Sequence, residues 1–179
     1  MSATIGINGF GRMGRLGLRA GWDRPELEFI RVNEIATDAA GSAHLLKFDS
    51  VHGTWMQETG TADDGMLIDG KSVDHTSNAS IEATDWSGCD IVIEATGKHH
   101  KKPESLEAYF DQGVRKVIVA APTEGALNIV YGINDDCYDP AVNHLVTAAS
   151  CTTNCLAPVV KVMHEKVGIE HGCMTTCLL

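Results

Sequence analysis

The sequence has no apolar run long enough to cross a membrane and too few basic residues to balance its acidic ones. A spanning helix needs about 20 consecutive apolar residues, so a membrane protein is not expected. The 14 Lys and Arg against 24 Asp and Glu give a net charge of −10, which disfavours nonspecific attraction to nucleic acid or to an anionic membrane. We find no signal peptide, and the sequence therefore predicts a cytoplasmic location.

The sequence also lacks internal repeats, low-complexity tracts, coiled-coil heptads and any cluster with structural-zinc spacing, so no metal site is predicted. Six cysteines are present, but a disulfide framework would need an extracellular context. They are Cys89, Cys137, Cys151, Cys155, Cys173 and Cys177. The hydrophobic content of 44% and the charged content of 21% are ordinary for a soluble globular protein.

A nucleotide-binding pattern opens the chain. Residues 4–8 alternate as in a strand, residues 9–14 read Gly-Phe-Gly-Arg-Met-Gly, residues 15–21 are typical of a helix, and residues 27–33 form a second strand. The first glycine makes a tight turn, the second lets the backbone approach a pyrophosphate, and the third lets the helix pack on the strand. In this context the motif predicts a dinucleotide site.

Glu34 follows the second strand at the position of the acidic residue in this fingerprint. Its carboxylate is expected to accept hydrogen bonds from the ribose hydroxyls and to repel a 2′-phosphate. The sequence therefore predicts NAD rather than NADP as the cofactor.

Further strands and helices alternate along the chain and predict an α/β fold with a doubly wound, mostly parallel sheet of the Rossmann type. The predicted strands are 66–69, 71–75, 91–97, 115–122, 128–131 and 145–147, and the predicted helices are 38–48 and 103–110. We place residues 49–80 as a meander at the edge of the sheet. The basic run 99–102 is interpreted as a solvated loop.

The most informative stretch is 149–155, which reads Ala-Ser-Cys-Thr-Thr-Asn-Cys and precedes a predicted helix over 152–166. A cysteine at a helix N-terminus meets free backbone N–H groups and the positive end of the helix dipole, and both favour the nucleophilic thiolate. Cys151 is therefore the candidate nucleophile. Ser150 and Thr152 are candidates for capping the helix and for donating to an anionic ligand.

The end of the predicted sheet suggests a domain boundary near residue 150. We expect residues 1–149 to form the nucleotide-binding domain and residues 150–179 to begin a second, α+β domain. Residues 169–176 are predicted to be the first strand of that domain's sheet.

Together these motifs resemble the glyceraldehyde-3-phosphate dehydrogenase family over essentially the whole chain. The matching segments are 7–15, 49–53, 94–97, 121–122, 131–134, 149–158 and 172–176. The resemblance implies an NAD domain followed by a catalytic domain, assembled as a homotetramer. It places the cofactor contacts at Asn8, Gly9, Phe10, Gly11, Arg12, Met13, Gly14, Glu34, Thr96 and Gly97.

The resemblance also implies the chemistry of a phosphorylated aldehyde and inorganic phosphate. Cys151 would attack the aldehyde to form a thiohemiacetal, hydride transfer would leave a thioester, and phosphate would release an acyl phosphate. The backbone N–H of Cys151 would help to hold the oxyanion. Ser150 and Thr152 match the positions that bind the attacking phosphate.

The sequence departs from the family pattern near its last residues. The family follows Met-Thr-Thr with an apolar residue and then the histidine that acts as base, whereas this chain has Cys177 and Leu178. We therefore expect a truncated product, a partial sequence or a frameshift that is inactive on its own. A smaller departure is Ala120, where the family commonly has serine.

Three alternatives remain open. Residues 32–36, Val-Asn-Glu-Ile-Ala, look more like erythrose-4-phosphate dehydrogenase than like the Asn-Asp-Pro of the glycolytic enzyme, and arsenate in place of phosphate is not distinguished. The alternative from another class is a non-catalytic module that binds NAD or presents a reactive thiol. Cofactor binding without product formation would favour the module.

Overall fold

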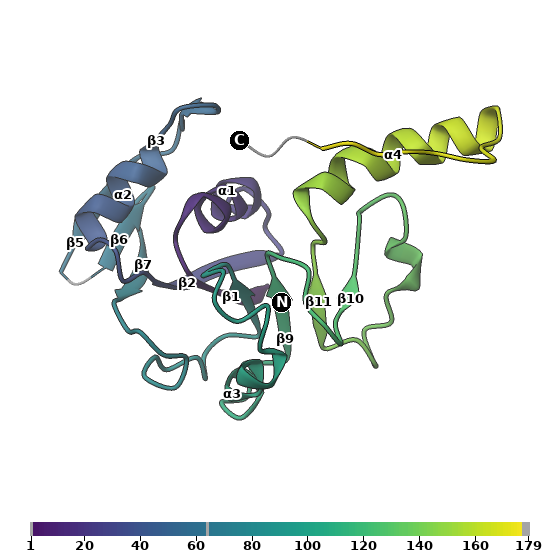
Figure 1. Cartoon of the computed structure of the whole chain (residues 1–179). Coiled ribbons are helices and arrows are strands. Elements are labelled where there is room, and N and C mark those ends of the chain that lie inside the picture. Colours follow the sequence, from purple (N-terminus) through teal and green to yellow (C-terminus); the bar gives the residue numbers. More distant parts are fainter. Residues whose placement is uncertain (1, 64, 177–179) are drawn as a thin grey trace.

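The computed structural model describes residues 2–63 and 65–176 and has an α/β fold (Figure 1). Within these residues one sheet has nine strands in the order β10-β11-β9-β8-β1-β2-β7-β6-β5. The strands are β1 (Ala3–Asn8), β2 (Leu27–Asn33), β5 (Thr59–Ala62), β6 (Gly65–Ile68), β7 (Lys71–Thr76), β8 (Ile91–Glu94), β9 (Lys116–Val119), β10 (Leu127–Asn128) and β11 (Leu145–Thr147). The short strands β3 (Phe48–Asp49) and β4 (Gly53–Thr54) form a separate hairpin.

The helices of the described residues are four α-helices and two short 3-10 helices. They are α1 (Arg12–Gly21), α2 (Ala39–Lys47), η1 (Pro103–Leu106), α3 (Glu107–Phe110), η2 (Asp135–Cys137) and α4 (Cys151–Lys166). In Figure 1, α1 and α2 lie on one face of the sheet and α3 lies on the other. Helices on both faces confirm the predicted doubly wound arrangement.

Strand direction is parallel from β10 to β7 and changes only in the meander that follows. Strands β7, β6 and β5 pair antiparallel at the edge, as predicted. Asp69 and Gly70 join β6 to β7, and their φ values of 48° and 77° are those of a two-residue hairpin turn that follows the twist of the strands.

Two hydrophobic cores fill the spaces between the sheet and its helices. Under α1 and α2, Ile7, Leu18 and Leu46 are fully buried. In the second core, Trp86 and Tyr109 of α3 are fully buried and their rings meet edge to face at 5.5 Å between centroids. The near-continuous apolar strands of the sequence are explained by burial on both faces.

Most element ends lie within a few residues of prediction. Helix α1 starts at Arg12, three residues earlier than predicted, because the turn leads directly into it. Helix α2 starts after Asp38, whose carboxylate accepts from the N–H of Gly41 at 2.8 Å. The prediction of a strand through residue 131 is wrong beyond Asn128. There the side-chain carbonyl of Asn134 accepts the N–H of Val130 at 2.8 Å and starts a turn.

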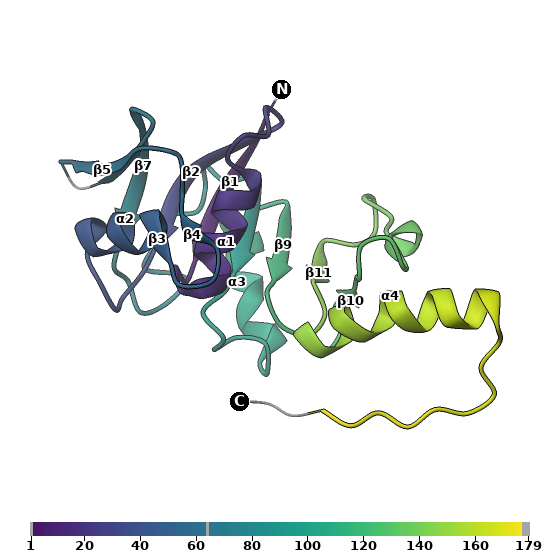
Figure 2. The same cartoon turned by 90° about the horizontal axis from the view of Figure 1, so that it is seen from above.

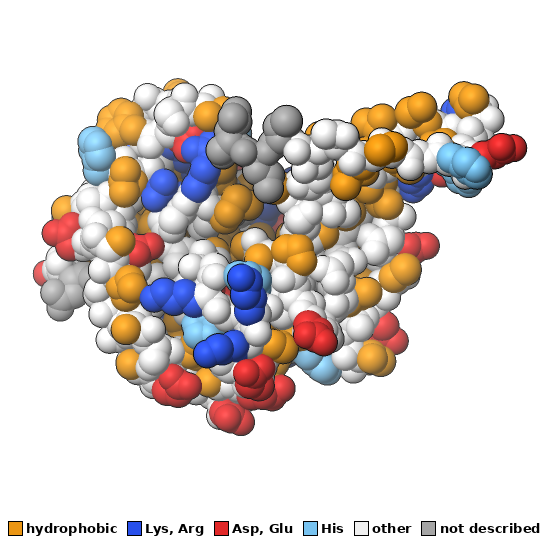
Figure 3. Space-filling model, viewed as in Figure 1, with side chains coloured by type: hydrophobic (Ala, Val, Ile, Leu, Met, Phe, Trp, Pro, Cys, Tyr) orange, Lys and Arg blue, Asp and Glu red, His pale blue; other side chains and the backbone are white. Residues whose placement is uncertain are grey.

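Helix α4 projects from the end of the sheet (Figure 2), and none of its residues is buried. Several apolar side chains along it are exposed, as the orange atoms at the upper right of Figure 3 show. The predicted strand over 169–176 is wrong, because these residues pair with no neighbouring strand in the described structure. No described helix has both the length and the apolar character needed to cross a membrane.

Candidate active site

The central strand β1 marks the point where the order of the sheet reverses. Strand β2 pairs on one side of it and β8 on the other, both parallel to it. The turns that follow β1 and β8 therefore diverge at the same edge and leave a crevice, which is where ligands bind in folds of this kind. The residues lining the crevice are Asn8, Gly9, Gly11, Asn33, Glu34, Ile35, Asn78, Ala79, Ala95, Thr96, Lys98 and His99.

The glycine turn is shaped by contacts that leave no room for side chains at two of its three glycines. A Cβ on Gly9, which has φ of 89°, would lie 2.6 Å from the backbone of Ala95, and one on Gly14 would lie 2.3 Å from the carbonyl oxygen of Gly9. A Cβ on Gly11 would meet nothing within 4 Å. Gly11 therefore presents bare backbone to the open crevice at the start of α1, which fits a pyrophosphate group.

Glu34 both lines the crevice and braces the glycine turn. Its Oε2 accepts the N–H of Phe10 at 2.8 Å, and its Oε1 accepts the N–H of Ala36 at 2.8 Å. Each carboxylate oxygen has a second lone pair. The carboxylate is thus held in place by the backbone and still has capacity to accept from ribose hydroxyls.

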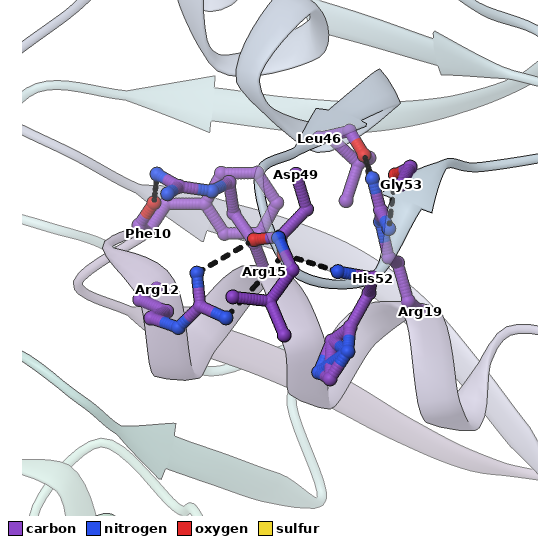
Figure 4. Close-up of polar contacts among 9 residues, drawn as sticks. Phe10, Arg12, Arg15, Arg19, Leu46, Asp49, His52 and Gly53 are labelled. Carbon is purple, nitrogen blue, oxygen red and sulfur yellow. Dashed lines mark hydrogen bonds and ion pairs between the residues drawn. The ribbon is translucent and has the colours of Figure 1, made fainter.

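Three of the predicted cofactor residues line neither this crevice nor the hollow that adjoins it. The side chain of Phe10 is 1% exposed and packs in the core, and Gly14 is buried between α1 and the turn. The guanidinium of Arg12 points to the β3–β4 hairpin, where it donates to Asp49 at 2.8 and 3.3 Å (Figure 4). The backbone N–H groups of His52 and Val51, together with Arg12, lower the pKa of Asp49 to about 2.

Arginine side chains of α1 donate hydrogen bonds to the end of α2, to the β3–β4 hairpin and to the glycine turn (Figure 4). Arg19 donates to the carbonyl oxygens of Leu46 at 2.8 Å and Gly53 at 3.2 Å. Arg15 donates to the carbonyl oxygen of Phe10 at 3.0 Å, within the turn itself. The first helix and its turn are therefore held from the hairpin side as well as from the sheet.

A second hollow adjoins the crevice on the side of β9. Thr96 lines both, and Met13, Gly97 and His100 line the second with Ala120 and Ala121. Ala120, where the family commonly has serine, thus lies at this hollow. Of the predicted cofactor residues, Met13 and Gly97 belong to it, while Asn8, Gly9, Gly11 and Glu34 belong to the crevice.

The structure adds crevice residues that the sequence analysis did not single out. Asn33 and Asn78 bond to each other through the Asn33 side chain, at 2.8 and 2.9 Å. The solvated-loop interpretation of residues 99–102 is wrong for the two histidines, which are half-buried, and His99 bonds to Ser105 at 2.8 Å. The sequence did carry one signal that this loop lies at the crevice, because the loop follows shortly after the end of a predicted strand.

Cys151 occupies the first position of α4 and is exposed. Ala149 before it has φ of 56°, an uncommon conformation for a residue with a side chain. Asn154 holds this bend by donating to the carbonyl oxygens of Ala148 at 2.7 Å and Ser150 at 2.9 Å. Ser150 caps the helix by accepting the N–H of Thr153 at 3.0 Å.

The cap leaves the first two N–H groups of α4, those of Cys151 and Thr152, without intrahelical acceptors. Thr152 is half-buried in this first turn, and the Ser150 hydroxyl is occupied by the cap. Because β1, β8, β9 and β11 are parallel neighbours, Cys151 follows the same edge of the sheet as the glycine turn. Strand β11, which precedes Cys151, lies three strand spacings from β1, or about 14 Å across the sheet.

We expect iodoacetamide to label Cys151 faster than the other cysteines at neutral pH, because it combines exposure with a helix N-terminus. Burial raises the pKa of Cys89 to about 11, so that thiol should react slowest of those described. Cys155, exposed in the second turn of the same helix, is the matched control. Peptide mapping of a folded sample gives the rates, and faster labelling of Cys155 would contradict the prediction. Cys177 lies outside the described residues.

Comparison with known proteins identifies both parts of the chain. Residues 3–102 match the family model described as the NAD binding domain of glyceraldehyde 3-phosphate dehydrogenase. Residues 150–178 match the model of the C-terminal domain of the same enzyme. NAD is therefore the cofactor of the N-terminal part, and the open backbone at Gly11 and the braced Glu34 fit it.

Curated relatives agree with these models. Glyceraldehyde-3-phosphate dehydrogenase 3 of Nostoc sp. is 56% identical over 98% of this chain and 53% of its own length. The enzyme of Geobacillus stearothermophilus is 43% identical over the same shares, and the cytosolic enzyme of Chlamydomonas reinhardtii is 42% identical over 96% and 51%. The chain spans about half the length of the curated relatives it matches. It belongs to the glyceraldehyde-3-phosphate dehydrogenase family.

Proposed function

We propose that this chain supplies the NAD site and the nucleophile of a phosphorylating, NAD-dependent glyceraldehyde-3-phosphate dehydrogenase. The observation that carries the proposal is the exposed Cys151 at the first position of α4, on the same sheet edge as the crevice at β1. A thiol placed there meets N–H groups that favour an anion, and the cofactor site lies along the same edge.

In this proposal the crevice residues hold the cofactor. Gly9, Gly11 and the first turn of α1 receive the pyrophosphate, and Glu34 accepts from the adenosine ribose. Asn8, Thr96 and Gly97 shape the turns beside it, and Met13 faces the adjoining hollow. Bound NAD supplies the hydride acceptor. Phe10, Arg12 and Gly14 contribute by packing and ion pairing rather than by direct side-chain contact.

The first turn of α4 performs the covalent part. The Cys151 thiolate attacks the aldehyde carbon, and the backbone N–H groups at this turn stabilise the resulting oxyanion. After hydride loss the acyl group remains on Cys151 as a thioester, which inorganic phosphate opens to an acyl phosphate and the free thiolate. Thr152 and the Ser150 turn are the proposed phosphate contacts. The expected departures at Cys177 and Leu178 lie outside the described residues.

The domain arrangement, assembly and location belong to the same proposal. Residues 1–149 form the NAD domain and residues 150–179 begin the catalytic domain; the family matches that support this division cover residues 3–102 and 150–178. Membership of the family implies a homotetramer. A cytoplasmic location agrees with the names of the relatives from C. reinhardtii and Gracilaria gracilis, which are called cytosolic.

The chain is expected to bind NAD more tightly than NADP, because the Glu34 carboxylate at the crevice repels a 2′-phosphate. Calorimetry with both cofactors measures the preference. Glu34→Gln keeps the side chain's length and removes its charge, so it should narrow the preference by about tenfold, the effect of 1.4 kcal/mol. Equal affinities in the unmodified chain would contradict this assignment of Glu34.

The catalytic proposal is tested by joining residues 1–176 to the part of the Nostoc relative that follows the aligned region. The joined protein should form NADH from glyceraldehyde 3-phosphate and phosphate, and the activity should depend on Cys151. A folded joined protein that binds NAD without forming NADH would favour the non-catalytic module.

A further inference from the structure

A buried carboxyl group lies at the end of β8, beside the hollow that adjoins the crevice, and no step of the proposed reaction uses it. Glu94, the last residue of β8, is 1% exposed. None of the ion pairs between described residues involves it. A buried carboxylate is costly unless hydrogen bonds replace the water it has lost. The groups that supply those bonds therefore show what this side chain holds in place.

Glu94 accepts hydrogen bonds from residues at the ends of both strands beside the crevice. Its Oε1 accepts the N–H of Thr96 at 2.9 Å and also the Thr96 hydroxyl, in the turn after β8. Its Oε2 accepts from the side-chain amide of Asn8 at 3.1 Å, immediately before the glycine turn. One carboxyl group thus connects the ends of two neighbouring strands by side-chain bonds.

Tyr109 of α3 completes the cluster from below the sheet. Its hydroxyl donates to Glu94 Oε2 at 2.5 Å and accepts from the Asn8 amide at 2.6 Å. Burial, and after it the neighbouring Glu94, raise the pKa of Tyr109 far above its usual range, so it stays a donor. The Asn8 side-chain carbonyl in turn accepts from Asn33 at 2.8 Å, which fixes the amide's orientation.

This pattern of donors and acceptors has one consistent arrangement. Asn8 must offer its NH₂ to Glu94 and Tyr109, because its oxygen is occupied by Asn33. Oε2 of residue 94 must then accept only. A glutamine at 94 would place its NH₂ or its carbonyl against the wrong partner, since it has one acceptor atom instead of two. A fully satisfied buried network of this kind specifies one geometry.

We propose that Glu94 is a positioning residue of the NAD site, which sets the spacing of the turns after β1 and β8 through Asn8 and Thr96. Tyr109 orients the carboxyl group. The inference rests on the proposed cofactor site, and it predicts that loss of the acceptor pattern weakens NAD binding in protein that remains folded.

The test compares NAD affinities of the 179-residue chain and its variants by calorimetry, with folding followed by circular dichroism. Glu94→Gln is expected to raise the Kd for NAD about tenfold or more, because loss of one charged hydrogen bond in a buried site has that size. Tyr109→Phe removes only the hydroxyl and should weaken binding in the same direction. It keeps the test available if Glu94→Gln fails to fold.

A compensating pair makes the test specific. Asn8→Asp combined with Glu94→Gln moves the two-oxygen acceptor to position 8, where it accepts from Asn33, Tyr109 and the glutamine NH₂. The double variant should recover NAD affinity to within about threefold of the unmodified chain. A folded double variant that stays as weak as Glu94→Gln would overturn the proposal.

Ser42→Ala is the matched control, because Ser42 is 1% exposed and its hydroxyl bonds to His75 at 2.9 Å away from the crevice. It should lower the melting temperature without changing the Kd. If Glu94→Gln behaves the same way, Glu94 only stabilises the fold and the proposal is wrong. Failure of the unmodified chain to bind NAD would instead contradict the proposed function.

Discussion

Cys151→Ser is expected to lower NADH formation by about 10³-fold or more in the protein that joins residues 1–176 to the Nostoc relative. The loss is this large because removing the covalent nucleophile removes the whole reaction path, whereas other substitutions remove only one contact. Cys151 is exposed at the first position of α4, and a serine there keeps the cap and the turn. NAD binding should therefore be unchanged. Cys155→Ser, one turn further along the same helix, is the matched control and should retain activity.

The 179-residue polypeptide alone provides the second comparison. We expect it to form NADH at least about 10²–10⁴ times more slowly than the joined protein, which is the usual contribution of a general base. No described side chain hydrogen-bonds to the Cys151 thiol, so none is placed to take a proton at this turn. Assays with phosphate and arsenate measure turnover, and erythrose 4-phosphate serves as the second aldehyde.

Two outcomes would contradict these expectations. Robust turnover by the 179-residue polypeptide would show that residues after the aligned region are not needed for proton transfer. Activity that survives Cys151→Ser but falls with Cys155→Ser would show that Cys155, and not Cys151, is the nucleophile. A higher rate with erythrose 4-phosphate than with glyceraldehyde 3-phosphate would favour the tetrose enzyme.

Gly14→Ala is expected to lower the free energy of unfolding by about 3 kcal/mol or more, because overpacking against rigid backbone is among the costlier substitutions. Its Cβ would lie 2.3 Å from the carbonyl oxygen of Gly9 and 3.1 Å from Ile7. Neither the helix nor the strand can move away without disturbing β1, the centre of the sheet. Urea unfolding of the 179-residue chain measures the change.

Gly11→Ala separates ligand approach from packing and is the matched comparison. A Cβ there meets nothing within 4 Å, and the φ of −65° suits any residue. Stability should change by less than about 1 kcal/mol. NAD binding should weaken about tenfold or more, because the methyl group occupies the space where backbone meets the pyrophosphate. If Gly11→Ala binds NAD normally, the pyrophosphate does not lie at this turn.

Local sequence patterns were sufficient to predict the structural features that depend on neighbouring residues. The glycine turn, the start of the helix at Asp38 and the Ser150 cap each depend on residues a few positions apart, and the structure shows all three at the predicted places. The buried strands β8 and β9 were also predicted, because apolar runs bounded by turns have few other uses in an alternating pattern.

Features that depend on distant residues were decided by the tertiary structure. Arg12 lies within the glycine motif, and its contact with the cofactor stays a prediction, but the partner of its side chain in the structure is Asp49, 37 residues further along the chain. Residues 169–176 have a strand-like composition, but a strand also needs a hydrogen-bonding neighbour.

The sequence by itself determined the doubly wound fold, the nucleotide turn and the place of Cys151 at a helix start, because each follows from periodicity or spacing within segments or from their order along the chain. Only the tertiary structure decided which polar side chains face the crevice and which support it from below. Glu94 and Asn8 are 86 residues apart in sequence, and their 3.1 Å bond exists because β1 and β8 pair side by side. Such pairing is set by the packing of the whole sheet, which no local pattern encodes.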